Sequence, residues 1–277
     1  MHFFLINLGL YAKFKALKNQ NPDLKILLSI GNNQPEKYEY LLTMKDDYFR
    51  KSFAKSAVKL LKENGFDGLD IGWDDTTDRY RNYEETISSK FVEFLRILYN
   101  LFEKNDLILS AHLSVFGKHI PNLQVHKISD YVDFINVATF LKENTPNLPA
   151  KGYALHSLDK SDLMTIDNVI HNLLKWGADP RKIVIGLSTY GVHQRGDIFD
   201  SKQGKMSKGN LNNKAAFHFS TKLISYNEIC LKTNISKTLL HDIQKLVSFV
   251  ANGDKYTFDD ERSFTVKVRI LFTLQNR

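Results

Sequence analysis

Four aspartates stand in one short apolar stretch of the sequence, FDGLDIGWDD, at residues 66–75. They are Asp67, Asp70, Asp74 and Asp75, and the residues between them are mostly apolar or glycine. A carboxylate in an apolar strand is costly to bury unless it is hydrogen-bonded or paired with an opposite charge. Grouped carboxylates can also act as general acid and base on a bound substrate. The segment therefore indicates a working acid/base site, the remains of one, or acids that cap the loop after a strand.

Five short runs of the sequence have the nearly continuous hydrophobicity of parallel strands that are covered on both faces. Amphipathic helical patterns lie between them, the first ended by Gly65 and the third by Gly177. The alternation predicts an α/β fold with a parallel sheet. The predicted strands occupy residues 25–31, 66–73, 107–115, 131–140 and 182–191, and the predicted helices occupy residues 46–65, 85–102 and 164–180.

Two α/β architectures compete for this pattern. A doubly wound sheet that binds a nucleotide has a glycine-rich first turn, but no G-x-G-x-x-G or Walker pattern follows any predicted strand. A TIM-type (β/α)8 barrel instead places its active groups at the carboxyl ends of its strands, where we expect the acids of residues 67–75 to lie. The sequence therefore favours the barrel.

The alternation of strands and helices stops after the fifth predicted strand. We expect residues 1–191 to form an incomplete (β/α) barrel and residues 192–258 to form an inserted α+β subdomain. The subdomain has a strand-like run at residues 224–230 and a helical pattern at residues 235–247. Residues 259–277 are expected to return to the barrel and to end before its last strand.

The composition argues against several classes of site. The 277 residues carry a formal net charge of +7, but Lys and Arg are spread along the chain, so we expect no nucleic-acid partner. A single cysteine, Cys230, excludes an internal disulfide and a cysteine-rich zinc site. The nine His have no metal-ligand spacing, and we expect neither a metal nor a cofactor. No run is long enough to span a membrane, so no membrane partner is expected, and the N-terminus has no convincing signal peptide.

Several motifs, in order along the chain, resemble the chitinases and chitinase-like proteins of glycoside hydrolase family 18. The segment LKNQNPDLKILLSIGN is similar to the helix and third strand that end in S-x-G-G, with Asn32 in place of the second Gly. FDGLDIGWDD resembles the fourth-strand signature D-G-x-D-x-D-x-E, and DFINVATFL resembles the sixth-strand D-F-x-N-x-M-x-Y-D. KIVIGLSTYG resembles the seventh strand, and SYNEIC and FDDERS resemble landmarks around the inserted subdomain. The resemblance runs from about Leu10 to about Lys267 and implies a TIM-type barrel in which strands three to seven are present.

The resemblance implies a substrate-assisted mechanism, which is an exception to the usual scheme with two carboxylates. In that family the 2-acetamido oxygen of the sugar attacks the anomeric carbon. The last Glu of the fourth-strand motif protonates the leaving oxygen, and the Asp two residues before it orients the acetamido group. A Tyr and an Asp from the sixth strand help to hold that group.

This chain departs from the motif at most of these positions. Gly72 stands where the third acid belongs, and Asp74 replaces the acid/base Glu with a side chain one methylene shorter, which is ~1.5 Å less reach. Phe140 and Leu141 replace the sixth-strand Tyr and Asp. A misplacement of about 1 Å can lower a rate ~10²-fold, and the loss of one stabilising electrostatic group commonly costs ~10²–10³. We therefore expect no hydrolysis by the family's mechanism.

Three hypotheses follow from the resemblance. The first is a disabled, secreted chitinase-like protein that binds chitin or N-acetylglucosamine oligosaccharides, with Asp70, Gly72 and Asp74 as the degenerate catalytic positions. The second is a weak glycoside hydrolase that uses Asp74 as general acid. The third is a non-functional chain, because strands one, two and eight of the barrel are expected to be missing, as in a fragment, a mispredicted gene product or a decayed copy. The substrate contacts implied by the resemblance are Trp73, Asn136, Phe140 and Tyr190.

Overall fold

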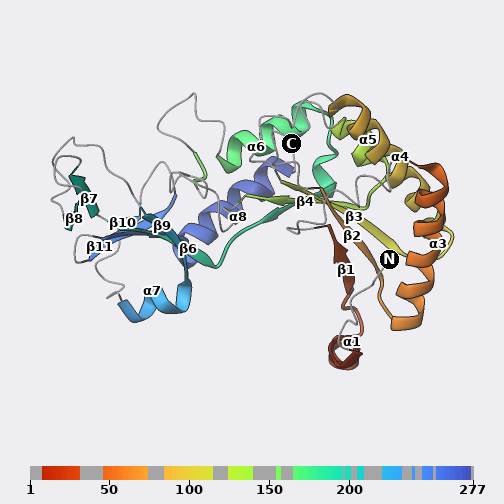
Figure 1. Ribbon diagram of the computed structural model, residues 1–277, viewed down its shortest axis with the longest axis horizontal. Helices are drawn as coiled ribbons and strands as arrows, with labels where there is room; N and C mark the ends of the chain where they lie inside the picture. Colours follow the sequence, from red (N-terminus) through yellow and green to blue (C-terminus); the bar gives the residue numbers. More distant parts are fainter. Residues whose placement is uncertain are drawn as a thin grey trace. The chain divides into compact units, whose positions relative to one another are not determined.

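The computed structural model divides the chain into two compact units, and each is described by itself (Figure 1). Unit 1 comprises residues 1–137 and 173–184, and unit 2 comprises residues 138–172 and 185–277. No described helix is both long and apolar enough to cross a bilayer. The structure describes residues 8–31, 46–73, 84–114, 124–139, 154–156, 165–195, 197–200, 205–208, 220–232, 239–240, 245–251 and 254–275.

A five-stranded sheet forms the centre of unit 1, and its strands follow one another in chain order, β1-β2-β3-β4-β5. The β1–β2 and β2–β3 pairs are parallel, with Leu27 opposite Gly68 and Gly68 opposite Ile108. All five strands expected from the sequence are confirmed, although the fifth ends earlier than expected. The strands are β1 (Leu27–Ile30), β2 (Gly68–Trp73), β3 (Ile108–Ser114), β4 (Phe134–Ala138) and β5 (Ile183–Gly186).

Helices α3 (Asp47–Asn64) and α4 (Glu84–Glu103) pack against each other and against this sheet (Figure 1). The Asp46 carboxylate caps α3 by accepting hydrogen bonds from two backbone N–H groups of its first turn, and Gly65 ends the helix at a φ of 70°. The buried faces of both helices are mostly apolar, with Arg50 of α3 and Ser88 of α4 as buried polar residues. The largest fully buried side chains of α3 and α4 are Leu61, Phe91, Leu95, Leu98 and Phe102.

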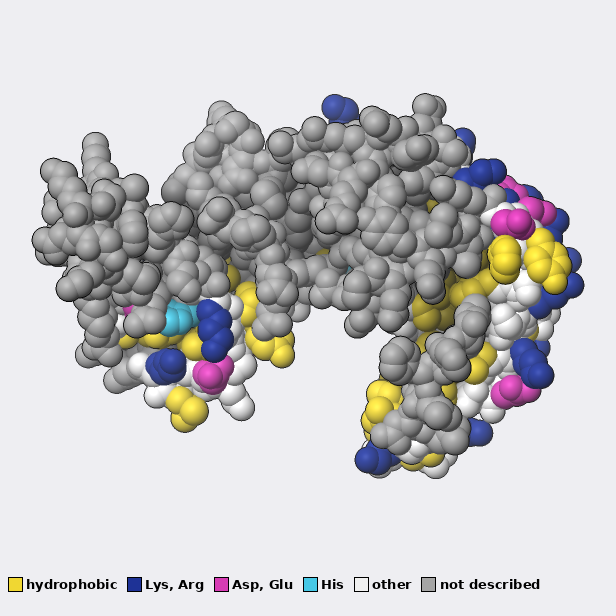
Figure 2. Space-filling view, viewed as in Figure 1, with side chains coloured by type: hydrophobic (Ala, Val, Ile, Leu, Met, Phe, Trp, Pro, Cys, Tyr) yellow, Lys and Arg dark blue, Asp and Glu magenta, His cyan; other side chains and the backbone are white. Residues whose placement is uncertain are grey.

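The outer face of α3 carries Lys, Asp and Glu side chains in mixed order (Figure 2). Lys51 Nζ lies 2.6 Å from Asp47 Oδ2, and Lys59 Nζ lies 3.8 Å from Glu63 Oε1. Both pairs are spaced four residues apart, so they bridge successive turns of the helix. This face of the molecule is a solvated helix surface and not a patch of one charge.

Three further described helices are α1 (Leu8–Gln20), α5 (Val125–Asp130) and α6 (Ile166–Lys175). The ring of Tyr11 in α1 packs edge-on against Phe66, with ring centroids 4.8 Å apart. Gly177, at a φ of 87°, follows α6 as expected, and the short 3-10 helix Pro180–Lys182 leads into β5. The three helical patterns expected from the sequence are confirmed by α3, α4 and α6.

Unit 2 contains an antiparallel sheet in the order β10-β11-β12-β6-β9. Phe249, Tyr256 and His193 lie in register across three of its strands, and their rings are stacked with centroids 4.6 Å apart in both pairs. The strands of unit 2 are β6 (Tyr190–Arg195), β9 (Ser220–Ser225), β10 (Leu239–Leu240), β11 (Val247–Ala251), β12 (Asp254–Phe258) and a separate hairpin, β7 (Asp197–Asp200) with β8 (Lys205–Lys208).

Three expectations for this part of the chain are wrong. The run at residues 182–191 is not one strand, because β5 ends at Gly186 and Tyr190 begins β6 of the other sheet. The run at residues 224–230 leaves the strand after Ser225 and continues as helix α7 (Tyr226–Lys232). The helical pattern at residues 235–247 contains strand β10, since Leu239 and Leu240 pair with Ser248 and Val247. In each case tertiary pairing or packing overrides a local pattern.

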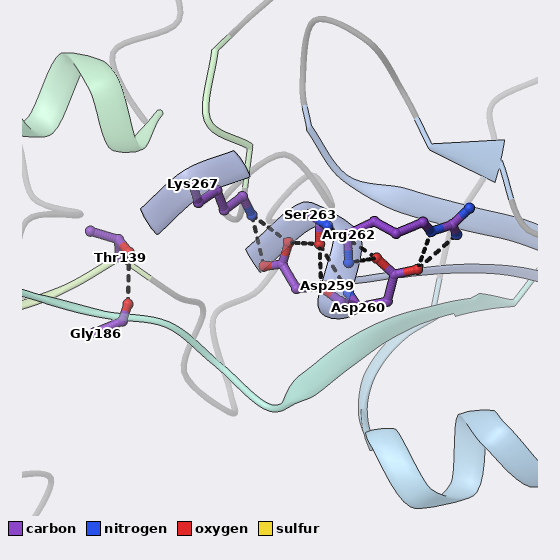
Figure 3. Close-up of polar contacts among 7 residues, drawn as sticks. All are labelled: Thr139, Gly186, Asp259, Asp260, Arg262, Ser263 and Lys267. Atoms are coloured by element: carbon purple, nitrogen blue, oxygen red, sulfur yellow. Dashed lines mark hydrogen bonds and ion pairs between the residues drawn. The ribbon is translucent and has the colours of Figure 1, made fainter. Parts of the chain in front are cut away.

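A buried ion pair anchors helix α8 (Glu261–Gln275) (Figure 3). Lys267 Nζ lies 2.5 Å from Asp259 Oδ1, and the two side chains are 0% and 1% exposed. Lys267 Nζ also donates to Asp259 Oδ2 at 2.7 Å, and Ser263 Oγ donates to Oδ1 at 2.7 Å. Burial raises the pKa of Asp259 and lowers the pKa of Lys267, and the attraction between the two charges offsets part of each shift.

We predict that Gly31→Ala destabilises the protein by about 2 kcal/mol or more. Gly31 has a φ of 93°, and an added Cβ would lie 2.6 Å from the carbonyl oxygen of Gly72. The matched control is Gly65→Ala, which has a similar φ of 70° but meets only the flexible Lys15 side chain at 3.4 Å. Urea unfolding followed by circular dichroism measures both variants. Equal losses in the two variants would show that the close approach of β1 to β2 is unimportant.

We predict that Lys267→Met costs about 3–5 kcal/mol, because it leaves the Asp259 carboxylate buried without its cation. Adding Asp259→Leu to that variant removes the uncompensated charge. The double variant is therefore expected to be more stable than Lys267→Met alone. Urea unfolding of Lys267→Met, Asp259→Leu and the double variant gives the coupling energy between the two residues. If the stability loss of the double variant equals the sum of the two single losses, the proposed coupling is contradicted.

Candidate functional site

A buried carboxylate, Asp70, ties four neighbouring strands of unit 1 together. Its Oδ2 accepts a hydrogen bond from Ser29 Oγ in β1 at 2.8 Å. Its Oδ1 accepts one from Ser110 Oγ in β3 at 2.6 Å and one from Asn136 Nδ2 in β4 at 2.9 Å. Asn136 Nδ2 also lies 3.2 Å from Ser110 Oγ. Because both carboxylate oxygens are satisfied, the charge can be 9% exposed without a large penalty.

The residues that follow this network point to the same side of the sheet. Successive side chains of a strand alternate between its faces, so Asp70 and Gly72 share one face of β2, and Ser110 and His112 share one face of β3. Gly72 and His112 are also register partners. Two residues beyond Asp70, toward the carboxyl ends of the strands, β2 therefore has no side chain at Gly72, and β3 has the imidazole of His112.

Asp67 lies at the opposite end of β2 from Gly72. Its Oδ2 accepts a hydrogen bond from the Ile26 backbone N–H at 2.6 Å and lies 2.7 Å from Lys18 Nζ. Burial acts to raise the pKa of Asp67, but the bonds from Lys18 and Ile26 outweigh it, so the pKa lies below its ordinary value. The expectation that all these acids stand at the carboxyl end of the strand is thus wrong for Asp67, which clamps α1 and β1 to β2.

Of the other predicted site residues, some lie among the described residues and some do not. Trp73 is the last residue of β2, with Leu113 as its register partner. Asp74 and Phe140 lie outside the described residues, so their roles stay predictions. Tyr190 belongs to unit 2, where it begins β6 with 53% of its surface exposed and donates its backbone N–H to Ser188 Oγ at 3.1 Å. The structure brings Asp70 and Asn136 into direct contact and places Gly72 beside them.

Three polar residues of this region were missed by the sequence reasoning: Ser29, Ser110 and His112. Each stands inside a run of apolar residues, in LLSIG or in LILSAHLSV. An isolated polar residue in an apolar strand was the available signal, because such a residue, where it is buried, needs a partner at the same height on a neighbouring strand. Among the described residues, no three His, Cys, Asp or Glu side chains gather as a possible metal-ligand set.

Unit 2 contains a separate hollow of about 760 Å³ along one side of α8. Asp259 and Asp260 contribute to its wall, but their carboxylates are already bound to Lys267 and Arg262 (Figure 3). The hollow therefore offers mainly an apolar surface. Its apolar lining residues are Tyr226, Phe264, Val268 and Phe272.

A parallel sheet with strands in chain order, helices between them and polar side chains at one level is the arrangement of a TIM-type (β/α)8 barrel. The model of glycosyl hydrolases family 18 matches residues 3–275, and the chain belongs to that family. The crystal structure of a group IV chitinase from Ostrinia furnacalis, in complex with allosamidin, has the same fold with a TM-score of 0.80. It is 22% identical, and the match covers 98% of this chain and 75% of that one.

Two other proteins show the range of the similarity. "Probable chitinase 2" of Drosophila melanogaster is 27% identical over 80% of this chain and 45% of its own length. The structure of YKL-39, solved in the presence of chitooligosaccharides, is 23% identical with a TM-score of 0.74, over 97% of this chain and 76% of that one. The chain spans about half the length of the curated relatives that it matches, from 42% to 70%.

We predict that Asp70→Ala destabilises the protein by about 2–4 kcal/mol, because three donors lose a charged acceptor, and Ser110 is buried and Asn136 half-buried. Asp70→Asn should cost less, since its amide oxygen can still accept and the Ser29 hydroxyl can rotate to accept from the amide nitrogen. Asp130→Ala, at the exposed end of α5, is the control and should change little. Urea unfolding measures all three, and wild-type stability for Asp70→Ala would refute the structural role of the network.

Proposed function

We propose that this protein is a chitinase-like protein that binds chito-oligosaccharides but does not hydrolyse them by the family's substrate-assisted mechanism. The observation that carries the proposal is Gly72. It lies inside an intact strand β2, two residues beyond the anchored Asp70, at the position of the third acid of the motif. A glycine there provides no group to orient the acetamido oxygen or to stabilise the charge that forms when it attacks.

The remaining chemical positions support the loss of hydrolysis. Asp74 retains a carboxyl group at the acid/base position but with a shorter side chain, and Phe140 and Leu141 lack the polar groups that would hold the acetamido group. These losses concern one catalytic unit, so their rate penalties are not multiplied. The loss at Gly72 alone corresponds to about 10²–10³ in rate.

Saccharide binding is supported by what the chain retains. The Asp70 network fixes the strands on which the site stands, and aromatic and amide side chains suit the recognition of sugars. The two solved structures of this family reported above were obtained with allosamidin and with chitooligosaccharides, respectively. We propose Trp73, Asn136, Phe140 and Tyr190 as the sugar contacts, residues 192–258 as an inserted subdomain, and an extracellular location that rests on the family resemblance.

A second candidate function is weak glycoside hydrolysis with Asp74 as general acid. One observation favours it: of the side chains that could protonate a leaving oxygen, an acid is still present at position 74. This candidate requires water or a substrate group to replace the support that is missing at Gly72.

We predict that the purified chain binds tetra-N-acetylchitotetraose with saturable heat in a calorimeter and releases no detectable shorter products. Trp73→Ala should weaken binding, and Asp74→Ala should leave the absence of turnover unchanged. Hydrolysis that Asp74→Ala abolishes would refute the proposal and support the weak hydrolase. Absence of both binding and turnover in a folded chain would refute both functions.

A further inference from the structure

Helix α8 has a buried polar side and, next to it, an exposed apolar side. Ser263 and Lys267, four residues apart, both donate to the buried Asp259 carboxylate and are 0% exposed (Figure 3). Val268 and Phe272, also four residues apart, have 40% and 62% of their surfaces exposed. Residues at this spacing lie on one side of a helix, so the two apolar side chains form a stripe along α8.

The hollow of about 760 Å³ lies along this exposed side of α8. Its wall includes Phe264 and Val268 from the helix and Tyr226 from the start of α7, and Tyr226 is itself 36% exposed. All of the lining residues belong to unit 2. An exposed apolar stripe beside an apolar hollow is a feature of contact surfaces, since it offers both a side chain to insert and a place to receive one.

Two opposite charges, Glu261 and Arg269, accompany the stripe. Both are exposed and both line the hollow, with Glu261 in the first turn of α8 and Arg269 eight residues later. This separation exceeds the spacing of three or four residues at which side chains of one helix pair. A second copy of α8 that runs antiparallel brings the first turn of each helix beside the later turns of the other, so opposite charges meet. A parallel copy sets like charges side by side.

We propose that two copies of this chain associate through α8, antiparallel and related by a two-fold axis near position 266. That axis brings Glu261 of each copy within two residues, or ~3 Å of helical rise, of Arg269 in the second copy. The charges of this surface are therefore complementary to a second copy of the same surface. The inference is independent of the proposed saccharide binding.

The same axis also matches the apolar side chains. Val268 of each copy lies opposite Phe264 of the second copy, and Phe272 reaches the hollow of the second copy near Tyr226. One helix pair with its flanking hollows is smaller than a standard interface, so the association is weak. We expect a dissociation constant of about 10 µM.

The test is sedimentation equilibrium of the full chain over a concentration series that spans the expected ~10 µM midpoint. Glu261→Arg alone and Arg269→Glu alone should each weaken self-association at least about tenfold, because each creates like-charge contacts across the axis. An equimolar mixture of the two variants should associate again, since one variant is cationic and the other anionic at both positions. Lys255→Glu, at an exposed lysine of β12 outside the hollow, is the control and should change nothing.

A second pair of variants tests the apolar contact. Val268→Asp should reduce self-association at least about tenfold, whereas Leu231→Asp, at an α7 residue that is 88% exposed, should leave it unchanged. Circular dichroism shows whether each variant is folded, and the charge variants decide if Val268→Asp is not. A wild type that stays monomeric throughout the series overturns the inference. So does self-association that the α8 variants leave unchanged, or a mixture of the two charge variants that does not regain it.

Discussion

The arrangement of unit 1 depends on a carboxylate that is placed where a charge is expensive. Asp70 lies in an otherwise apolar strand, and three donors from β1, β3 and β4 make its burial tolerable. The same bonds fix the relative heights of four strands, because each donor reaches the carboxylate only in one register. A parallel sheet has no short turns to set its register, so a central polar anchor supplies that information.

Two acids of residues 66–75, Asp67 and Asp70, have different structural roles. Asp67 clamps α1 and β1 to the start of β2, and Asp70 holds the middle of the sheet. Neither role requires a reaction. The positions to which the family resemblance assigns purely chemical roles are Gly72 and Asp74, where this sequence departs from the motif. Under the proposed function, the fold keeps the acids that stabilise it, and the positions assigned to catalysis alone carry other residues.

Unit 2 uses a second buried charge in a comparable way. Asp259 and Lys267 connect the end of the antiparallel sheet to α8, and Ser263 Oγ donates a further hydrogen bond to the Asp259 carboxylate. Such a pair stabilises the fold only while both partners are present, since either charge alone would be buried without compensation. Polar contacts in both units thus fix specific arrangements, and the apolar residues around them supply most of the burial energy.

The sequence by itself determined five strands of the sheet and the helices α3, α4 and α6, since long periodic runs with glycine stops have few alternatives. The ordered motifs determined the family. The sequence could not determine the middle of unit 2, where residues 226–230 are helical and Leu239–Leu240 form a strand, because cross-strand pairing decided those conformations. Nor could it show that Ser29, Ser110 and Asn136 converge on Asp70, or that His112 stands beside Gly72. Ser29, Ser110 and Asn136 are 41, 40 and 66 positions from Asp70 in the chain, and His112 is 40 positions from Gly72. Only strand register brings these residues together.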